Sequence, residues 1–269
     1  MVCRTLPGSR STHSTTVPAG QNPFNYPKGQ ETVEIFWLRI DNIGSQNPCD
    51  IYGTIVAADG LGNQYIYNRG RSEPESVSPG KYALLTGPPQ TIEAADSFAF
   101  IVDLKDYDYV SFDNNIIAQG TINWDAYNIA NEYDKAITET IKGASGAVTL
   151  HYIVLSDTAQ ALVEVILIKG DGEDPANVYG YITVYNKHGD SDILQKPDSG
   201  SYIDVSPNTP IPPSRSVIAV PMTGALIINA LLYDTISSDN EIANGKAVFK
   251  PELGSWRASL FEEYMTRLA

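Results

Sequence analysis

The residues best suited to chemistry lie in an acidic loop that occurs twice along the chain. The first copy spans residues 106–120 (DYDYVSFDNNIIAQG) and the second spans residues 233–245 (YDTISSDNEIANG). With Asp108 placed on Asp234, the Asp, Ser and Asn residues of the two loops repeat at a constant spacing of 126 residues. A long fixed period of this kind indicates a duplicated structural unit.

Carboxylates crowded into one loop repel one another unless water or a cation lies between them, and oxygen-rich side chains are the ligands that calcium prefers. We therefore predict a calcium site in the first unit, built from two loops, with Asp113 and Asn114 as alternatives for one position. Its candidate ligands are Asp41, Asp50, Asp106, Asp108, Asp113 and Asn114. The competing interpretation is a polar turn between two strands, because Asp, Asn, Ser and Gly are common turn residues.

The second copy of the loop offers fewer carboxylates. With Asp108 placed on Asp234, Leu232 falls where the first loop has Asp106, and Asn177 stands in place of Asp50. Each lost carboxylate removes charge that a hard cation needs. We therefore expect the second unit to bind calcium more weakly than the first, or not at all.

Other signatures of catalysis or of a transition-metal site do not occur in the sequence. The three histidines, His13, His151 and His188, are far apart, and the two cysteines form no disulfide framework. There is no phosphate-binding loop and no nucleophile elbow. Paired carboxylates could still act as acid and base, although no pattern marks a particular pair. We expect a non-enzymatic binding module rather than an enzyme.

The charge of the chain limits its partners. It carries 32 acidic residues against 18 basic ones, for a net charge of −14. Nucleic acid is therefore not an expected partner. An anionic membrane repels such a chain unless bound calcium reverses the local charge. We expect either calcium-dependent docking on an anionic phospholipid surface or a protein partner. The expected location is cytoplasmic, and docking on phospholipid would place the chain at the membrane surface.

The composition favours short strands joined by turns. Hydrophobic residues make up 42% of the chain, and it contains 16 Tyr, 21 Gly and 17 Pro. Short apolar runs recur in the same order in both halves. We predict an all-β protein of two tandem antiparallel β-sandwiches, with a disordered tail over residues 1–30, a first unit over 31–157 and a second over 158–269.

The ends of the predicted units differ. The first unit begins with a strand at residues 32–40, in which Val33, Ile35 and Trp37 form the core face, and closes with a strand at 146–155. The second unit has no counterpart of that closing strand. Residues 255–269 instead place their apolar side chains on one helical face. This predicted helix packs on its own unit, covers the edge left by the missing strand, or docks a partner.

The acidic loop resembles the third calcium loop of a C2 domain. The similar residues are Asp106-Tyr-Asp108, Ser111 and Asp113-Asn114, followed by the segment that ends at Gly120. Residues 50–53 (DIYG) resemble the Asp-Pro-Tyr that ends the first C2 loop. The resemblance implies calcium binding between the two loops and a C2-like sandwich around them.

A second resemblance covers residues 32–249. The segments DIYGTI (50–55), LTGP (85–88), VTLHYIV (148–154) and ALVEVI (161–166) are similar to a domain family of unknown function that is abundant in grasses. Some relatives carry this domain fused to a ribosome-inactivating N-glycosidase domain. The chain has no room for that domain and no Glu-Ala-x-x-Arg-like segment for its chemistry. This resemblance favours the alternative function, a metal-independent protein-interaction or defence-related scaffold.

Overall fold

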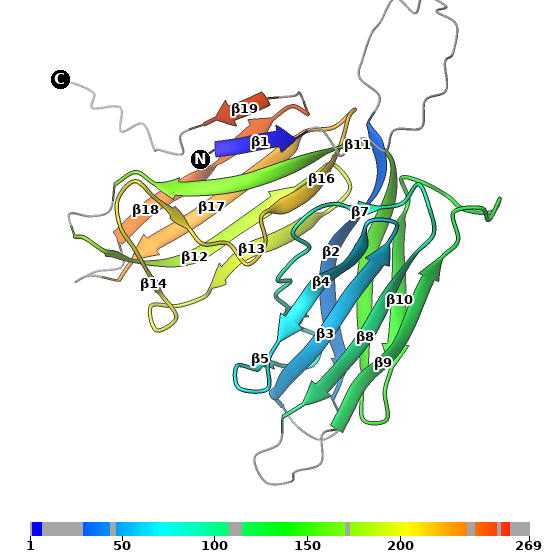
Figure 1. The fold of residues 1–269 in the computed structure, drawn as a ribbon. Coiled ribbons are helices and arrows are strands. Elements are labelled where there is room, and N and C mark those ends of the chain that lie inside the picture. Colours follow the sequence, from blue (N-terminus) through cyan, green and yellow to red (C-terminus); the bar gives the residue numbers. More distant parts are fainter. Residues whose placement is uncertain are drawn as a thin grey trace, which may run out of the picture.

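The structure, a computed structural model, describes residues 2–6, 29–43, 47–107, 115–169, 173–235, 240–251 and 254–258. The regular elements in these ranges are β-strands that pair antiparallel. They build two sandwiches in tandem, which meet at an angle (Figure 1). The predicted all-β fold class is therefore confirmed.

The first sandwich has two layers of strands. They are β2 (Gln30–Asn42), β3 (Cys49–Asp59), β4 (Gly62–Arg69), β5 (Glu75–Val77), β6 (Tyr82–Ala83), β7 (Ile92–Glu93), β8 (Phe98–Asp106), β9 (Asn115–Trp124), β10 (Ala136–Lys142) and β11 (Ala147–Leu167). One layer has the order β4-β3-β8-β9, with β5 beside β3. The other contains β10, the first half of β11 and β2, with β6 and β7 along the outer edge of β2.

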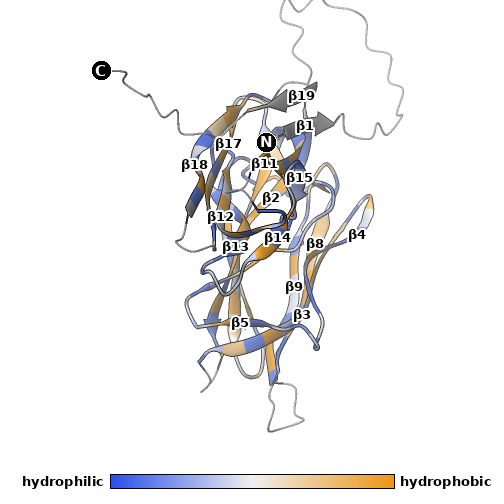
Figure 2. Ribbon diagram, turned by 90° about the vertical axis from the view of Figure 1, so that its left-hand side faces the viewer, coloured by the Kyte–Doolittle hydropathy of each residue, from blue (hydrophilic) through white to orange (hydrophobic). Residues whose placement is uncertain are grey.

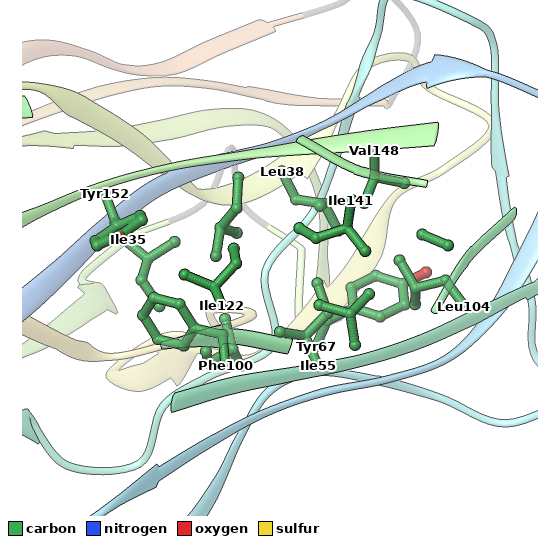
Figure 3. Packing of buried hydrophobic residues seen from close by; sticks show 14 of the residues in the cluster. Ile35, Leu38, Ile55, Tyr67, Phe100, Leu104, Ile122, Ile141, Val148 and Tyr152 are labelled. Atoms are coloured by element: carbon green, nitrogen blue, oxygen red, sulfur yellow. The ribbon is translucent and has the colours of Figure 1, made fainter. Parts of the chain in front are cut away.

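Apolar side chains from both layers fill the first core. Ile35, Leu38 and Tyr152 from one layer lie close to Phe100 and Ile122 from the other (Figure 3). The residues of β8 alternate between buried and more exposed positions, as in a strand with one face on a core. Apolar residues accordingly follow the strands of both sandwiches, while the turns are more hydrophilic (Figure 2).

The second sandwich repeats this design. Its further strands are β12 (Ala176–Tyr185), β13 (Asp190–Lys196), β14 (Ile203–Val205), β15 (Thr209–Ile211), β16 (Val217–Pro221), β17 (Leu226–Asp234), β18 (Asn240–Phe249) and β19 (Gly254–Arg257). One layer has the order β13-β12-β17-β18, with β14 beside β12. The other is built on the second half of β11, which pairs with β15 and β16. The second sandwich has its own hydrophobic core, separate from the first.

Strand β11 belongs to both sandwiches. It has 21 residues, which pair with β10 over residues 147–153, with β2 up to Thr158, and with β16 from Thr158 onward. The closing strand predicted at residues 146–155 is thus only the first part of a longer strand that continues into the second sandwich. β11 bends where it passes from one sandwich to the other (Figure 1).

The N-terminus was predicted as a disordered tail, and this is wrong for residues 2–6. They form β1 (Val2–Leu6), which pairs with the second half of β11 from Glu164 to Gln160. β1 thus occupies the place that the first half of β11 has in the first sandwich, and it supplies the closing strand that the second unit was predicted to lack. The polar composition of the tail conceals this strand, because its partner lies about 160 residues away. Residues 7–28 lie outside the described residues.

The predicted C-terminal helix is also contradicted where the structure describes it. Residues 254–257 form strand β19, which pairs with β1 as β10 pairs with β11. The open edge of β1 offers backbone hydrogen bonds that outweigh the helical pattern of the side chains. Residues 259–269, which carry most of the predicted helix, lie outside the described residues.

The core face of β2 changes partway along the strand. The pairing of β2 with β11 shifts by one residue between His151 and Tyr152, so that Phe36 is the extra residue of a bulge. Ile35 and Leu38 therefore both face the first core, whereas Trp37, predicted on the core face, packs with Phe36 in a separate cluster. The alternation of side chains in the sequence does not reveal where a strand contains a bulge.

Candidate functional site

The structure brings two of the six predicted calcium ligands together. Asp50 is the second residue of β3 and Asp106 is the last residue of β8. The backbone N–H of Asp50 donates to Oδ1 of Asp106 at 3.2 Å. The N–H of Tyr107 donates back to the carbonyl of Asp50 at 2.8 Å. Asp106 is buried, so its carboxylate holds the start of the neighbouring strand.

The other predicted ligands are placed differently. Asp41 accepts a hydrogen bond from Nε of Arg39 at 2.6 Å and another from the Thr149 hydroxyl, so its charge is already compensated. Asp108, Asp113 and Asn114 lie outside the described residues. Within the described ranges no three His, Cys, Asp or Glu side chains come close enough together to hold a metal ion. Calcium binding therefore stays a prediction.

The repeat alignment needs correction. β8 and β17 have the same length and the same order of buried and exposed positions, which places Asp106 on Asp234 and Leu104 on Leu232. The N–H of Asn177 donates to Oδ1 of the fully buried Asp234 at 3.2 Å, as Asp50 does to Asp106. The second unit has thus kept this carboxylate, contrary to the sequence alignment. The loop after β17 is shorter than the loop after β8, and this displaced the alignment.

The junction of the two sandwiches contains a buried ion pair. Nη2 of Arg215, in the segment before β16, donates to Oε1 of Glu34 on β2 at 2.9 Å. The N–H of Ala219 donates to Oε2 of Glu34 at 2.7 Å. Glu34 and Arg215 are only 4% and 3% exposed. Burial raises the pKa of Glu34, although the Arg215 charge beside it acts in the opposite direction.

Further contacts fix the angle between the sandwiches. A Cβ added to Gly189 would lie 2.7 Å from the Phe36 ring, so the turn before β13 packs tightly on β2. The hydroxyls of Thr32 and Thr158 are 2.8 Å apart and buried. Packed rings and buried hydrogen bonds of this kind resist rotation of one sandwich against the other.

A cleft of about 780 Å³ opens beside this ion pair. Its walls come from β4 and residues 86–89 of the first sandwich, and from β11 and residues 210–216 of the second. The lining side chains are mainly neutral and polar or apolar, and they include Asn63, Gln64, Tyr65, Asn68, Thr86, Pro88, Pro89, Leu162, Glu164, Pro210, Pro213, Ser214, Arg215 and Ser216. Tyr65 is 52% exposed. The ion pair with Glu34 neutralises Arg215, and Glu164 is the other charged residue of the lining.

Sequence reasoning missed this cleft. Glu34 was the available signal, because a carboxylate within an apolar strand requires a buried partner. Nothing in the sequence pointed to Arg215, which is 181 residues away. Cys49 is no nucleophile, since burial raises the pKa of its thiol to about 12.

Fold and site together define an all-β protein of two fused antiparallel sandwiches with a polar cleft at their junction. The chain belongs to the family described as "Domain of unknown function (DUF6598)", whose model matches residues 32–260. A search of curated proteins finds no match.

Among solved structures, the chain is similar to human GIVD cytosolic phospholipase A2 in complex with methyl gamma-linolenyl fluorophosphonate, and to the same enzyme with this inhibitor and terbium chloride. In both cases the identity is 7% and the TM-score 0.24, with 84% of this chain and 29% of the enzyme chain covered. At this level neither the fold nor the activity of the enzyme is transferred to this chain. The described residues include no helix of sufficient length and apolarity to span a bilayer.

Proposed function

We propose that the chain is a non-enzymatic binding module that holds a neutral oligosaccharide in the cleft between its two sandwiches. The observation that carries the proposal is a cleft of about 780 Å³ with a mainly uncharged polar lining, in a chain whose net charge is −14. Ligand pockets are commonly found at such junctions and have volumes of about 300–1,000 Å³.

The chemistry of the lining selects the ligand class. The amides of Asn63 and Asn68 and the hydroxyls of Ser214 and Ser216 both donate and accept hydrogen bonds. A ligand rich in hydroxyl groups satisfies both roles. The half-exposed ring of Tyr65 offers a flat apolar surface for the C–H face of a sugar ring. A strongly charged ligand would find no matching charge cluster in this cleft.

A glycan array probed with the purified chain tests this proposal, followed by calorimetry with the best ligand. Replacing Tyr65 by Ala removes the stacking surface and should weaken binding roughly threefold to tenfold. Tyr127→Ala is the matched control, because Tyr127 is exposed and lies outside the cleft. Failure of every glycan to bind, or equal losses in the two variants, would contradict the proposal.

The second candidate function is calcium binding at the acidic end of the first sandwich, with calcium-dependent docking on anionic membranes. It is supported by the contact between Asp50 and Asp106 at the point where the acidic loop leaves β8. Calcium would neutralise this end of the chain and let it approach lipid phosphates.

Melting curves in chelator and in calcium test this candidate, because an ion that binds the folded state raises the melting temperature. The variant Asp108→Asn with Asp113→Asn should abolish the rise. Asp106 is left unchanged, because its buried carboxylate holds the start of β3. A wild-type curve indifferent to calcium would remove the metal site. Co-sedimentation with anionic vesicles, with and without chelator, then distinguishes membrane docking from a protein partner.

A further inference from the structure

A second, smaller cavity lies at the junction, with walls of contrasting chemistry. It has a volume of about 210 Å³ and lies between β2 and residues 82–85 of the first sandwich and β13 of the second. The first wall is aromatic and apolar, and the second is acidic. Trp37 and Tyr82 lie on the first wall, and Asp190 and Asp192 lie on the second.

The aromatic wall is held in place by its neighbours. The rings of Trp37 and Tyr82 lie 5.2 Å apart at 53°, so they form an open angle. Trp37 also stacks on His151 with a centroid distance of 4.6 Å, and Nδ1 of His151 lies 2.8 Å from the Thr138 hydroxyl. Tyr82 remains 52% exposed, which leaves ring surface for a ligand. The wall is thus preorganised.

The opposite wall carries negative charge, and its two aspartates form no ion pair with the residues that the structure describes. Asp190 and Asp192 are the charged residues among those that line the cavity, and both are acidic. The Thr183 hydroxyl donates to Oδ1 of Asp192 at 2.8 Å and orients the carboxylate. Arg39 lies 5.6 Å from the centre of the Trp37 ring, but it pairs with Asp41 and so adds no free positive charge. Burial raises the pKa of Asp192, and a bound cation would lower it again.

We propose that this cavity binds a compact quaternary ammonium ion of the choline type. The faces of aromatic rings attract such cations, and desolvated sites strengthen the attraction. A quaternary nitrogen donates no hydrogen bonds, so it fits a wall of rings and methyl-sized apolar groups, with the carboxylates balancing its charge at a short distance. The volume lies below that of sites for drug-sized ligands, which suits a small headgroup. This site is independent of the larger cleft.

Calorimetry with the full chain tests the proposal. The probes are tetramethylammonium chloride, choline chloride and 3,3-dimethyl-1-butanol, which has the shape of choline without its charge. We expect the two cations to bind saturably with a dissociation constant of about 1 mM, and the neutral isostere to bind at least roughly tenfold more weakly. Equal affinity for the isostere, or no saturable binding of either cation, would overturn the proposal.

Two variants and their matched controls assign the binding to this cavity. Tyr82→Leu should weaken choline binding roughly threefold to tenfold by removing a ring, and Asp190→Asn should weaken it in the same direction by removing charge. Both side chains are exposed, so folding is retained, which melting curves verify. Tyr202→Leu and Asp198→Asn make the same changes at exposed positions outside the lining. Wild-type affinity in Tyr82→Leu, or equal loss in the controls, would refute the assignment.

A vesicle experiment separates free ions from lipid headgroups that carry the same chemistry. Sedimentation with phosphatidylcholine vesicles that free choline reverses would show that the cavity accepts the lipid headgroup. Absence of sedimentation, together with calorimetric binding of choline, would identify the free ion as the ligand. Sedimentation that free choline leaves unchanged, with no calorimetric signal, would refute the proposal.

Discussion

Replacing Glu34 by Leu should destabilise the whole molecule, because it leaves Arg215 buried without a counterion. Arg215 is 3% exposed, and its Nε and Nη1 atoms already have no hydrogen-bond partner among the described residues. Breaking a buried ion pair by removing one partner costs about 3–5 kcal/mol. At about 2–4 °C per kcal/mol for a protein of this size, the melting temperature should fall by roughly 6–20 °C.

The double variant Glu34→Leu with Arg215→Met separates the cost of an unpaired charge from the loss of packing. Replacing both members of a buried pair by apolar residues is often neutral or stabilising, so the double variant should recover most of the lost stability. Asp41→Asn is the control. It breaks the more exposed pair with Arg39 and should cost at most about 1 kcal/mol.

Calorimetric melting of the wild type, the two single variants, the double variant and the control measures these differences. If Glu34→Leu had the same melting temperature as the wild type, the ion pair would contribute nothing to the stability of the junction. If the double variant were less stable than both single variants, the loss would come from packing rather than from an unpaired charge. Either result would refute the reasoning.

Three further predictions concern the junction, a buried acid and the N-terminal strand. Gly189→Ala places a Cβ against the Phe36 ring and should lower the free energy of unfolding by about 1–3 kcal/mol. Gly70→Ala, where the nearest atom to an added Cβ is 3.6 Å away, should lower it less. Chemical denaturation of both variants measures the difference. Burial raises the pKa of Glu75 in the folded protein. The contribution of Glu75 to stability is therefore fully present below its pKa in the unfolded chain, and it is lost as pH rises through its pKa in the folded protein. Unfolding free energies at about pH 4 and 7 should therefore show the wild type losing stability relative to Glu75→Gln as pH rises; parallel curves would contradict this. Deleting residues 2–6 exposes the edges of β11 and β19 and should cause the protein to self-associate, which light scattering detects. A truncated protein that stays monomeric with an unchanged melting temperature would show that β1 is dispensable.

The sequence predicted local structure well where one strand has one exposed and one buried face. β8 and β17 alternate along their whole length, in line with the apolar runs expected to recur in the same order in both halves. The tandem order of strands followed from the repeated segments. These features depend on side-chain period, which is present in the sequence itself.

The side-chain period could not predict which distant segments pair with each other. β1 pairs with β11 across about 160 residues, and no local pattern in five residues specifies such a partner. The alignment of the acidic loops failed for a related reason, since a length change between β17 and β18 shifted Asp234 by two positions. The residue type of Asp106 predicts a metal ligand, and the fold adds a structural contact of its buried carboxylate that the sequence does not reveal.

The shared strand β11 has a consequence for how the molecule comes apart. One continuous backbone provides hydrogen bonds to both sheets, so melting of either sandwich removes a template that the other needs. Cutting the chain near Thr158 would leave two fragments, each with half of an interrupted ladder, rather than two independent domains. Unfolding should thus be one cooperative transition, and a ligand bound in either junction cavity would stabilise the distant ends of both sandwiches alike.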